Sequence, residues 1–130
     1  MTSGSTKVLI VEDDHRLLGA LSRRMKEIGC ACVSCDNASE AMLQFATGGF
    51  DLVVTDLTMP EMDGMSIIAM IRSQSDIPII VVTGHAEEYA RVLTTYRRIT
   101  MIRKPFHPLT FVARVRATIA TIGVSDARVG

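Results

Sequence analysis

The sequence predicts an α/β fold in which five parallel strands form one doubly wound sheet covered by helices on both faces. Two observations predict this. Short apolar runs, typical of strands buried on both faces, alternate five times with longer stretches whose apolar residues recur at helical spacing. In addition, a helix follows every strand, and βα units joined by right-handed crossovers produce a parallel sheet. The common strand order at this size is 2-1-3-4-5, which places a ligand site beyond the carboxyl ends of strands 1 and 3.

The first half of the chain is expected to contain three strands and two helices. The strands are placed at residues 7–12, 31–35 and 50–56. The first helix spans residues 15–28 and ends at Gly29, a residue type that commonly terminates helices. Its apolar face consists of Leu17, Leu18, Leu21, Met25 and Ile28. The second helix begins after Asn37, which with Glu40 resembles a capping signal, and ends at the glycine pair 48–49.

The second half of the chain continues the same alternation. Pro60 and Gly64 mark a loop, and a helix over residues 65–73 follows it. Strands are expected at residues 77–83 and 99–102. Between them, residues 86–97 form a helix that turns Tyr89, Val92, Leu93 and Tyr96 inward. The last helix carries an apolar stripe of Leu109, Val112, Val115, Ile119 and Ile122.

Length and composition are those of one ordinary globular domain. The chain has 130 residues, of which 48% are hydrophobic and 22% charged. We expect a flexible N-terminus over residues 1–6, the domain over 7–122 and a short polar tail over 123–130. No apolar run approaches the length of a membrane span, and the first residues lack the features of a signal peptide. A cytoplasmic location is therefore expected.

The net charge is zero but unevenly divided along the chain. Residues 1–85 hold eleven acids and six bases, whereas residues 86–130 hold three acids and eight bases. The acidic part could bind a cation, and the basic part could bind an acidic partner or be a solvated face. The chain has no Trp and few aromatic residues, which argues against nucleic-acid binding through base stacking.

The three cysteines, Cys30, Cys32 and Cys35, are interpreted as structural. Cys32 and Cys35 have the spacing of a redox motif, but they lie in a predicted strand, where residues three apart point to opposite faces. No fourth ligand completes a zinc site. An odd number of cysteines fits a reducing compartment.

Polar side chains follow the four strands that can reach the predicted ligand site. Glu12 and Asp13 follow strand 1, Asp56 ends strand 3, Thr83 ends strand 4, and Lys104 follows strand 5. Three carboxylates without a nearby arginine suit a hard divalent cation, most simply Mg²⁺. An aspartate beside Mg²⁺ can attack phosphorus and form an aspartyl phosphate, while Lys104 and Thr83 neutralise or bind the phosphoryl oxygens.

Four motifs carry a resemblance to a known family over about residues 6–122. "VLIVEDD", "DLVVTDLTMPEMDG", "IPIIVVTGH" and "KPF", in this order and spacing, resemble the receiver domain of two-component response regulators, which has the flavodoxin-like, CheY-like fold. The resemblance implies a signalling domain, not a turnover enzyme, that takes a phosphoryl group from a histidine kinase or a histidine phosphotransfer protein. At most it would phosphorylate itself from small donors and dephosphorylate itself.

The resemblance also assigns roles to individual residues. Asp56 would be the phosphoacceptor, and Thr83 and Lys104 would contact the phosphoryl group during catalysis. Mg²⁺, or Mn²⁺ as a substitute, would be bound by Asp13 and Asp56 directly, by Glu12 through water and by the backbone carbonyl of Thr58. The Lys104–Pro105 peptide bond is expected to be cis, as in this family.

Several neighbouring residues receive smaller roles. Asp14 is expected to start the first helix, and Asp63 and Gly64 to shape the loop. The resemblance places Thr58 and His85 at the two positions that tune the lifetime of the phosphoryl group, although His85 could equally be a plain surface residue. His15 and His107 have no chelating partner in the sequence and receive no role.

The sequence departs from the family pattern before the last strand. Many receivers have Tyr or Phe three residues before the lysine, where this chain has Met101, and "YRRI" replaces the usual glycine-containing turn. We therefore expect Thr83 to remain the lever of the switch, with a shift of the backbone around residues 84–103 rather than a flip of one aromatic rotamer. Met101 is flexible and carries no hydroxyl.

The output and the context of the domain stay open. The surface formed by helix 4, strand 5 and helix 5 is expected to bind a downstream protein or a second copy, without direct contact to nucleic acid or membrane. The chain could stand alone, or it could be a receiver cut from a hybrid histidine kinase or a multidomain transcriptional regulator. A haloacid-dehalogenase-type phosphatase is a remote alternative, because its acidic metal pair follows the lysine, whereas Glu12 and Asp13 come first here. A flavodoxin-type FMN site would need a phosphate loop after strand 1, which is missing.

Overall fold

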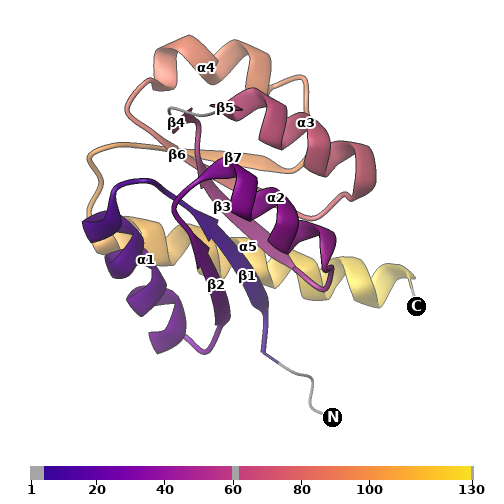
Figure 1. The fold of residues 1–130 in the computed structure, drawn as a ribbon. Coiled ribbons are helices and arrows are strands. Elements are labelled where there is room, and N and C mark those ends of the chain that lie inside the picture. Colours follow the sequence, from indigo (N-terminus) through magenta and orange to yellow (C-terminus); the bar gives the residue numbers. More distant parts are fainter. Residues whose placement is uncertain (1–4, 60–61, 130) are drawn as a thin grey trace.

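A five-stranded parallel sheet forms the centre of the molecule (Figure 1). The computed structural model describes residues 5–59 and 62–129, so most of the N-terminal segment 1–6 and the loop residue Pro60 lie outside the described residues. The strands are β1 (Lys7–Val11), β2 (Ala31–Cys35), β3 (Leu52–Asp56), β6 (Ile79–Thr83) and β7 (Ile99–Arg103). Their order is β2-β1-β3-β6-β7, which confirms the predicted order 2-1-3-4-5 when these five strands are counted along the chain.

Helices cover both faces of this sheet. They are α1 (His15–Glu27), α2 (Ala38–Ala46), α3 (Gly64–Gln74), α4 (Ala86–Leu93) and α5 (Pro108–Val129). The helices α1 and α5 pack on one face, and α2, α3 and α4 pack on the other (Figure 1). Two caps follow the sequence: Asp14 accepts the N–H groups of Arg16 and Leu17, and Asn37 accepts that of Glu40.

Each face of the sheet has its own apolar core, because alternate strand residues point to opposite sides. Val8 and Ile10 pack with α1 and α5, whereas Leu9 and Val11 pack with α2, α3 and α4. The cysteines follow the same rule. All three are free thiols, and Cys32 lies on the face of α1 and α5 while Cys35 lies on the other face.

The predicted helix over residues 86–97 is too long. The helix α4 ends at Leu93, and Val92, which was expected to face inward, is 40% exposed. The chain turns at Arg98, which has a left-handed φ of 58° where glycine is the favoured residue. The guanidinium of Arg72 on α3 holds this turn by donating to the Arg97 carbonyl over 2.9 and 2.7 Å.

The predicted apolar stripe of the last helix is partly wrong. Leu109 is 65% exposed, and Phe111, which the stripe omits, is fully buried. The helix begins at Pro108, so that Phe111, Val115 and Thr118 form its innermost row. It also continues to Val129, through most of the segment predicted as a tail.

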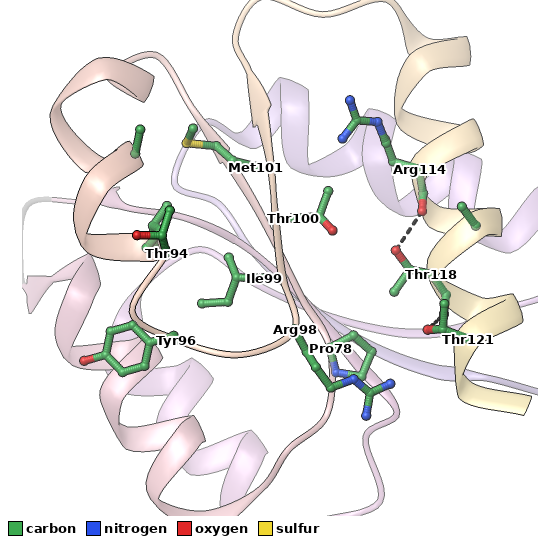
Figure 2. A pocket seen from close by; sticks show the side chains of 13 residues that line it. Pro78, Thr94, Tyr96, Arg98, Ile99, Thr100, Met101, Arg114, Thr118 and Thr121 are labelled. Carbon is green, nitrogen blue, oxygen red and sulfur yellow. Dashed lines mark hydrogen bonds between the residues drawn. The ribbon is translucent and has the colours of Figure 1, made fainter. Parts of the chain in front are cut away.

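A short hairpin lies at the carboxyl edge of the sheet, where the sequence predicts only a loop. It consists of β4 (Thr58–Met59) and β5 (Met62–Asp63), which pair antiparallel. At one edge of the sheet, β7 lies between α4 and α5, and its residues Ile99, Thr100 and Met101 are labelled in Figure 2. Among the helices of the described residues, none combines the length and apolar character that crossing a bilayer requires.

Candidate functional site

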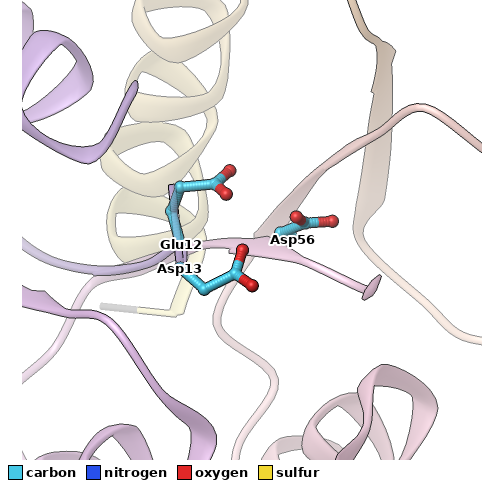
Figure 3. A group of neighbouring side chains, drawn as sticks. All are labelled: Glu12, Asp13 and Asp56. Atoms are coloured by element: carbon cyan, nitrogen blue, oxygen red, sulfur yellow. The ribbon is translucent and has the colours of Figure 1, made fainter. Parts of the chain in front are cut away.

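Three carboxylates converge at the carboxyl edge of the sheet. Glu12 and Asp13 directly follow β1, and Asp56 is the last residue of the neighbouring strand β3. One oxygen of each carboxylate lies within 4.8 Å of the others, and Figure 3 shows the three side chains pointing toward a common space. Glu12 and Asp56 are buried, whereas Asp13 is exposed, so the cluster opens to solvent on the side of Asp13.

Lys104 is the counter-charge of this cluster. Its ammonium lies 2.9 Å from Glu12 Oε1 and 3.1 Å from Asp56 Oδ2. The backbone fixes this position, because the Lys104 N–H donates to the Thr83 carbonyl over 2.8 Å and the next peptide bond, to Pro105, is cis as the resemblance implies. Burial opposes the charged ammonium, but the hydrogen bond to Glu12 and the charge of Asp56 outweigh it and raise the pKa of Lys104.

The charges of the cluster do not balance without a further cation. Three carboxylates face one ammonium, which leaves two negative charges in a partly buried space. Burial raises the pKa of Glu12, even though Lys104 and the Asp14 N–H both bind its carboxylate. A divalent cation with a preference for oxygen ligands matches both the donor set and the excess charge.

The carboxylate of Asp56 is held in one orientation. Its Oδ1 accepts the Thr58 N–H over 3.0 Å, and its Oδ2 accepts from Lys104. Thr58, in β4, therefore places its backbone beside the acid and exposes its own side chain to solvent. A carboxylate fixed in this way, next to an ammonium and other acids, can act as a nucleophile toward a phosphorus centre.

Thr83 is the last residue of β6, at the same edge of the sheet, and His85 directly precedes α4. Thr83 is buried, and its hydroxyl accepts the His85 N–H over 2.9 Å. In the described part of the chain, this hydroxyl makes no hydrogen bond to Asp56 or Lys104. His85 is exposed and lies 3.3 Å from Glu88 on α4. Thr83 thus lies at the carboxyl edge, but its hydroxyl is hydrogen-bonded to His85, the residue that precedes α4.

Other residues singled out from the sequence have structural roles. Asp63 caps α3 by accepting the Met65 N–H over 3.1 Å. A Cβ on Gly64 would lie 2.3 Å from the Leu57 carbonyl oxygen, so only glycine fits there. His107, which received no role, accepts the Leu109 N–H at the start of α5.

Two side-chain contacts between distant residues, one at the start of α1 and one at the start of α4, were not predicted. His15 lies 2.8 Å from Asp36, and this hydrogen bond lowers the pKa of the exposed Asp36 carboxyl. Arg103, at the end of β7, pairs with Glu87 in the first turn of α4. These partners are far apart in sequence, so no local pattern could have indicated them.

The sequence and the fold both match known proteins. The profile of the response regulator receiver domain family matches residues 8–116. The chain is 32% identical over 120 residues to a probable transcriptional regulator, ycf27, of Pyropia yezoensis, covering 92% of this chain and 49% of that protein. It is 30% identical over 122 residues to the sensory transduction protein RegX3 of Mycobacterium bovis, covering 93% of this chain and 54% of that protein.

A solved structure shows the same similarity. The non-phosphorylated HemR receiver domain of Leptospira biflexa superposes with a TM-score of 0.80 at 30% identity, over 88% of this chain and 94% of that one. The chain spans about half the length of the curated relatives that it matches.

Proposed function

Because this chain belongs to the response regulator receiver domain family, we propose that it accepts a phosphoryl group on Asp56 and signals through a phosphorylation-dependent change of conformation. One observation carries the proposal: the oriented, buried carboxylate of Asp56 lies beside two further acids and is bound by the ammonium of Lys104. The family membership removes the reason to consider a haloacid-dehalogenase-type phosphatase. The domain limits 7–122 and the cytoplasmic location stay predictions.

Mg²⁺ is the proposed cofactor, with Mn²⁺ as a possible substitute. The residues fit such an ion, since they offer only oxygen donors and carry two negative charges in excess of Lys104. Asp13 and Asp56 would bind it directly, Glu12 through water, and the Thr58 carbonyl would complete the protein ligands. Bound there, Mg²⁺ would neutralise charge on the phosphoryl oxygens during transfer.

The proposed reaction is transfer from a phosphohistidine of a histidine kinase or a histidine phosphotransfer protein. A carboxylate oxygen of Asp56 forms a bond to phosphorus while the P–N bond of the donor breaks, and the departing imidazole keeps the electron pair and takes up a proton. The ammonium of Lys104 moves from the carboxylates to one phosphoryl oxygen. The Thr83 hydroxyl gives up the hydrogen bond that it accepts from the His85 N–H and donates to a second phosphoryl oxygen. Thr58 and His85, at the mouth of the site, would tune how long the phosphoryl group survives.

The proposed output is binding of a partner, not catalysis. Thr83 connects the site to α4, and the surface of α4, β7 and α5 would bind a downstream protein or a second copy. Met101, half-buried on this surface, is flexible and carries no hydroxyl, so the switch would shift the backbone of residues 84–103 instead of flipping one aromatic side chain. The relatives named as probable transcriptional regulators are about twice as long as this chain, which supports a receiver from a multidomain regulator as one alternative, besides a hybrid kinase or a stand-alone protein.

The test is phosphorylation by acetyl phosphate in the presence of Mg²⁺, followed by intact-mass measurement. The wild type should gain one phosphoryl group, Asp56→Asn should gain none, and EDTA should abolish the reaction. Asp36→Asn is the matched control, because it neutralises an exposed acid outside the cluster and should react like the wild type. An unmodified wild type, or equal modification of Asp56→Asn, would contradict the proposal.

A further inference from the structure

The strand β7 lies at the edge of the sheet, so among the residues that the structure describes no strand neighbours one side of its backbone. On the other side, the Arg98 carbonyl accepts the Ile79 N–H over 3.0 Å, and the Lys104 N–H donates to the Thr83 carbonyl over 2.8 Å. Residues in a parallel ladder alternate between the two sides. The even-numbered residues 98–104 therefore bond to β6, and the N–H and C=O groups of residues 99, 101 and 103 turn to the open edge.

These outward backbone groups are free to bind a partner. Within residues 5–59 and 62–129, no hydrogen bond joins the outward N–H and C=O groups of Ile99, Met101 or Arg103 to another part of the chain. An exposed row of unpaired backbone groups is a template for pairing with a further strand.

A groove of about 650 Å³ runs along this edge between α4 and α5 (Figure 2). Ile99, Thr100 and Met101 all line it, although consecutive strand residues point to opposite faces of a sheet. Figure 2 shows Ile99 and Met101 on the side of α4, and Thr100 on the side of α5. A groove bordered by both faces of one strand lies over the edge of that strand, where the backbone is accessible.

The groove is lined by apolar and hydroxyl-bearing side chains and by two arginines, with no acidic residue among them. Leu93 of α4 and Ala117 of α5 form part of its two walls, and Arg98 and Arg114 supply its positive charge. Elsewhere on this surface Arg97 pairs with Asp76 and Arg103 with Glu87, but Arg114 makes no ion pair with another described residue. The unbalanced positive charge favours an acidic occupant.

We propose that β7 binds an extended acidic segment of a partner protein, which adds to the sheet as a sixth strand. The outward groups of Ile99 and Met101 supply main-chain hydrogen bonds, the groove walls accept alternate side chains, and Arg98 and Arg114 pair with carboxylates. A second copy fits less well, because both sides of a two-fold contact carry the same groove lining, which holds Arg98 and Arg114 but no acidic residue. The partner is the downstream protein of the proposed function, on which this inference rests.

The first test is an NMR titration with a synthetic peptide, acetyl-Glu-Asp-Leu-Thr-Val-Glu-Asp-amide. At saturation, amide hydrogen exchange of Ile99 and Met101 should slow by about tenfold or more, since their N–H groups become bonded. Exchange of Thr100 and Ile102, whose N–H groups already bond to β6, should change less than about twofold. Equal slowing of all four amides, or no binding up to millimolar peptide, would overturn the proposal.

Two further peptides distinguish strand addition from binding through side chains alone. One is N-methylated at Leu and Val, which share one edge of an extended peptide, and the other is N-methylated at Thr, on the opposite edge. Only one of them should lose about tenfold or more in affinity, because only one edge faces β7. Equal affinities of both methylated peptides would overturn the strand-addition mode.

Charge reversal on α5 tests the acidic character of the partner. Arg114→Glu should weaken binding of the peptide by about tenfold, and should strengthen binding of a lysine analogue, in which Lys replaces every Glu and Asp of the peptide. Arg116→Glu is the matched control, because it makes the same change on the same helix outside the groove and should have less than about a twofold effect. Equal effects of both variants on peptide binding would overturn the assignment of Arg114 as a contact for an acidic partner.

Two more readouts complete the test. Sedimentation without peptide should show a monomer, and a dimer whose formation protects Ile99 and Met101 would assign the edge to a second copy and overturn the acidic partner. Phosphorylation from acetyl phosphate is measured on the same preparation. A protein that accepts the phosphoryl group but binds no peptide would overturn the edge inference alone, whereas failure of phosphorylation would overturn the proposed function.

Discussion

Replacing Lys104 by methionine should destabilise the protein mainly when Mg²⁺ is absent. The substitution removes the ammonium that lies 2.9 Å from Glu12 and 3.1 Å from Asp56, whose side chains are only 1% and 6% exposed. At an effective dielectric constant of about 20, each contact contributes about 5 kcal/mol of Coulomb attraction, most of which offsets the desolvation of the charges. Removing one partner of a fully buried pair costs about 3–5 kcal/mol. Because the Lys104 side chain is 24% exposed, we expect a loss of about 2–3 kcal/mol in the free energy of unfolding.

The assay is urea unfolding at pH 7, with and without saturating Mg²⁺. The ion would supply the positive charge that the variant lacks, so Mg²⁺ should reduce the loss to about 1 kcal/mol or less. Lys26→Met is the control, since Lys26 is an exposed lysine in the last turn of α1, and it should change stability by less than about 0.5 kcal/mol. An equal loss with and without Mg²⁺ would refute the claim that Lys104 compensates the carboxylate cluster.

The pH dependence of the same variant has a defined sign. The pKa of Lys104 is raised in the folded protein, so its stabilising contribution is complete below the unfolded pKa and disappears only when alkaline pH passes the folded pKa. The pKa of Glu12 is also raised, so protonation of Glu12 favours folding as the pH falls through its folded pKa. Without Lys104 the pKa of Glu12 should rise further, and the stability gap between variant and wild type should narrow on acidification.

Three other perturbations test separate parts of the structure. Asp13→Asn should weaken Mg²⁺ binding by at least about tenfold in calorimetric titration and raise stability without Mg²⁺ by about 0.5–1 kcal/mol, because it relieves repulsion; an unchanged titration would argue that Asp13 is no ligand. Gly64→Ala should cost about 2–4 kcal/mol in urea unfolding, because its Cβ would lie 2.3 Å from the Leu57 carbonyl oxygen. Gly19→Ala is the control, because a Cβ on this residue of α1 would have no atom within 4 Å, and it should stabilise the protein by about 0.5–1 kcal/mol. Equal effects of the two glycine substitutions on the free energy of unfolding would contradict the packing argument. Beryllofluoride with Mg²⁺ should shift amide resonances of residues 84–103, and changes confined to the acidic cluster would count against the output surface.

The arrangement of the site follows from the sequence because it depends on topology. Five βα units require a parallel sheet, and the carboxyl ends of parallel strands meet at one edge. Glu12, Asp13 and Asp56 could therefore be placed together from their positions after strands 1 and 3, and the structure confirms that they converge. The position of Lys104 at this edge followed from the same rule, applied to strand 5, whereas its contacts with Glu12 and Asp56 were not predicted.

The features that sequence reasoning missed depend on contacts between distant segments. The helix α4 ends at Leu93, and the turn that leads from it into β7 depends on the left-handed Arg98 and on the guanidinium of Arg72, neither of which is visible in local periodicity. The inner row of α5 depends on the residue at which the helix starts, so a stripe aligned on Leu109 missed Phe111. The open edge of β7 is a property of the strand order, not of any motif.

The most direct test of the central claim is to locate the phosphoryl group. The protein is treated with acetyl phosphate and Mg²⁺ and then with sodium borohydride, which reduces an aspartyl phosphate to homoserine, and the product is mapped by peptide mass spectrometry. Homoserine should appear at position 56, and at no other acidic residue, in amounts that disappear when EDTA replaces Mg²⁺. Homoserine at Asp13 or at another aspartate, or the corresponding five-carbon alcohol at a glutamate, with position 56 intact, would contradict the account.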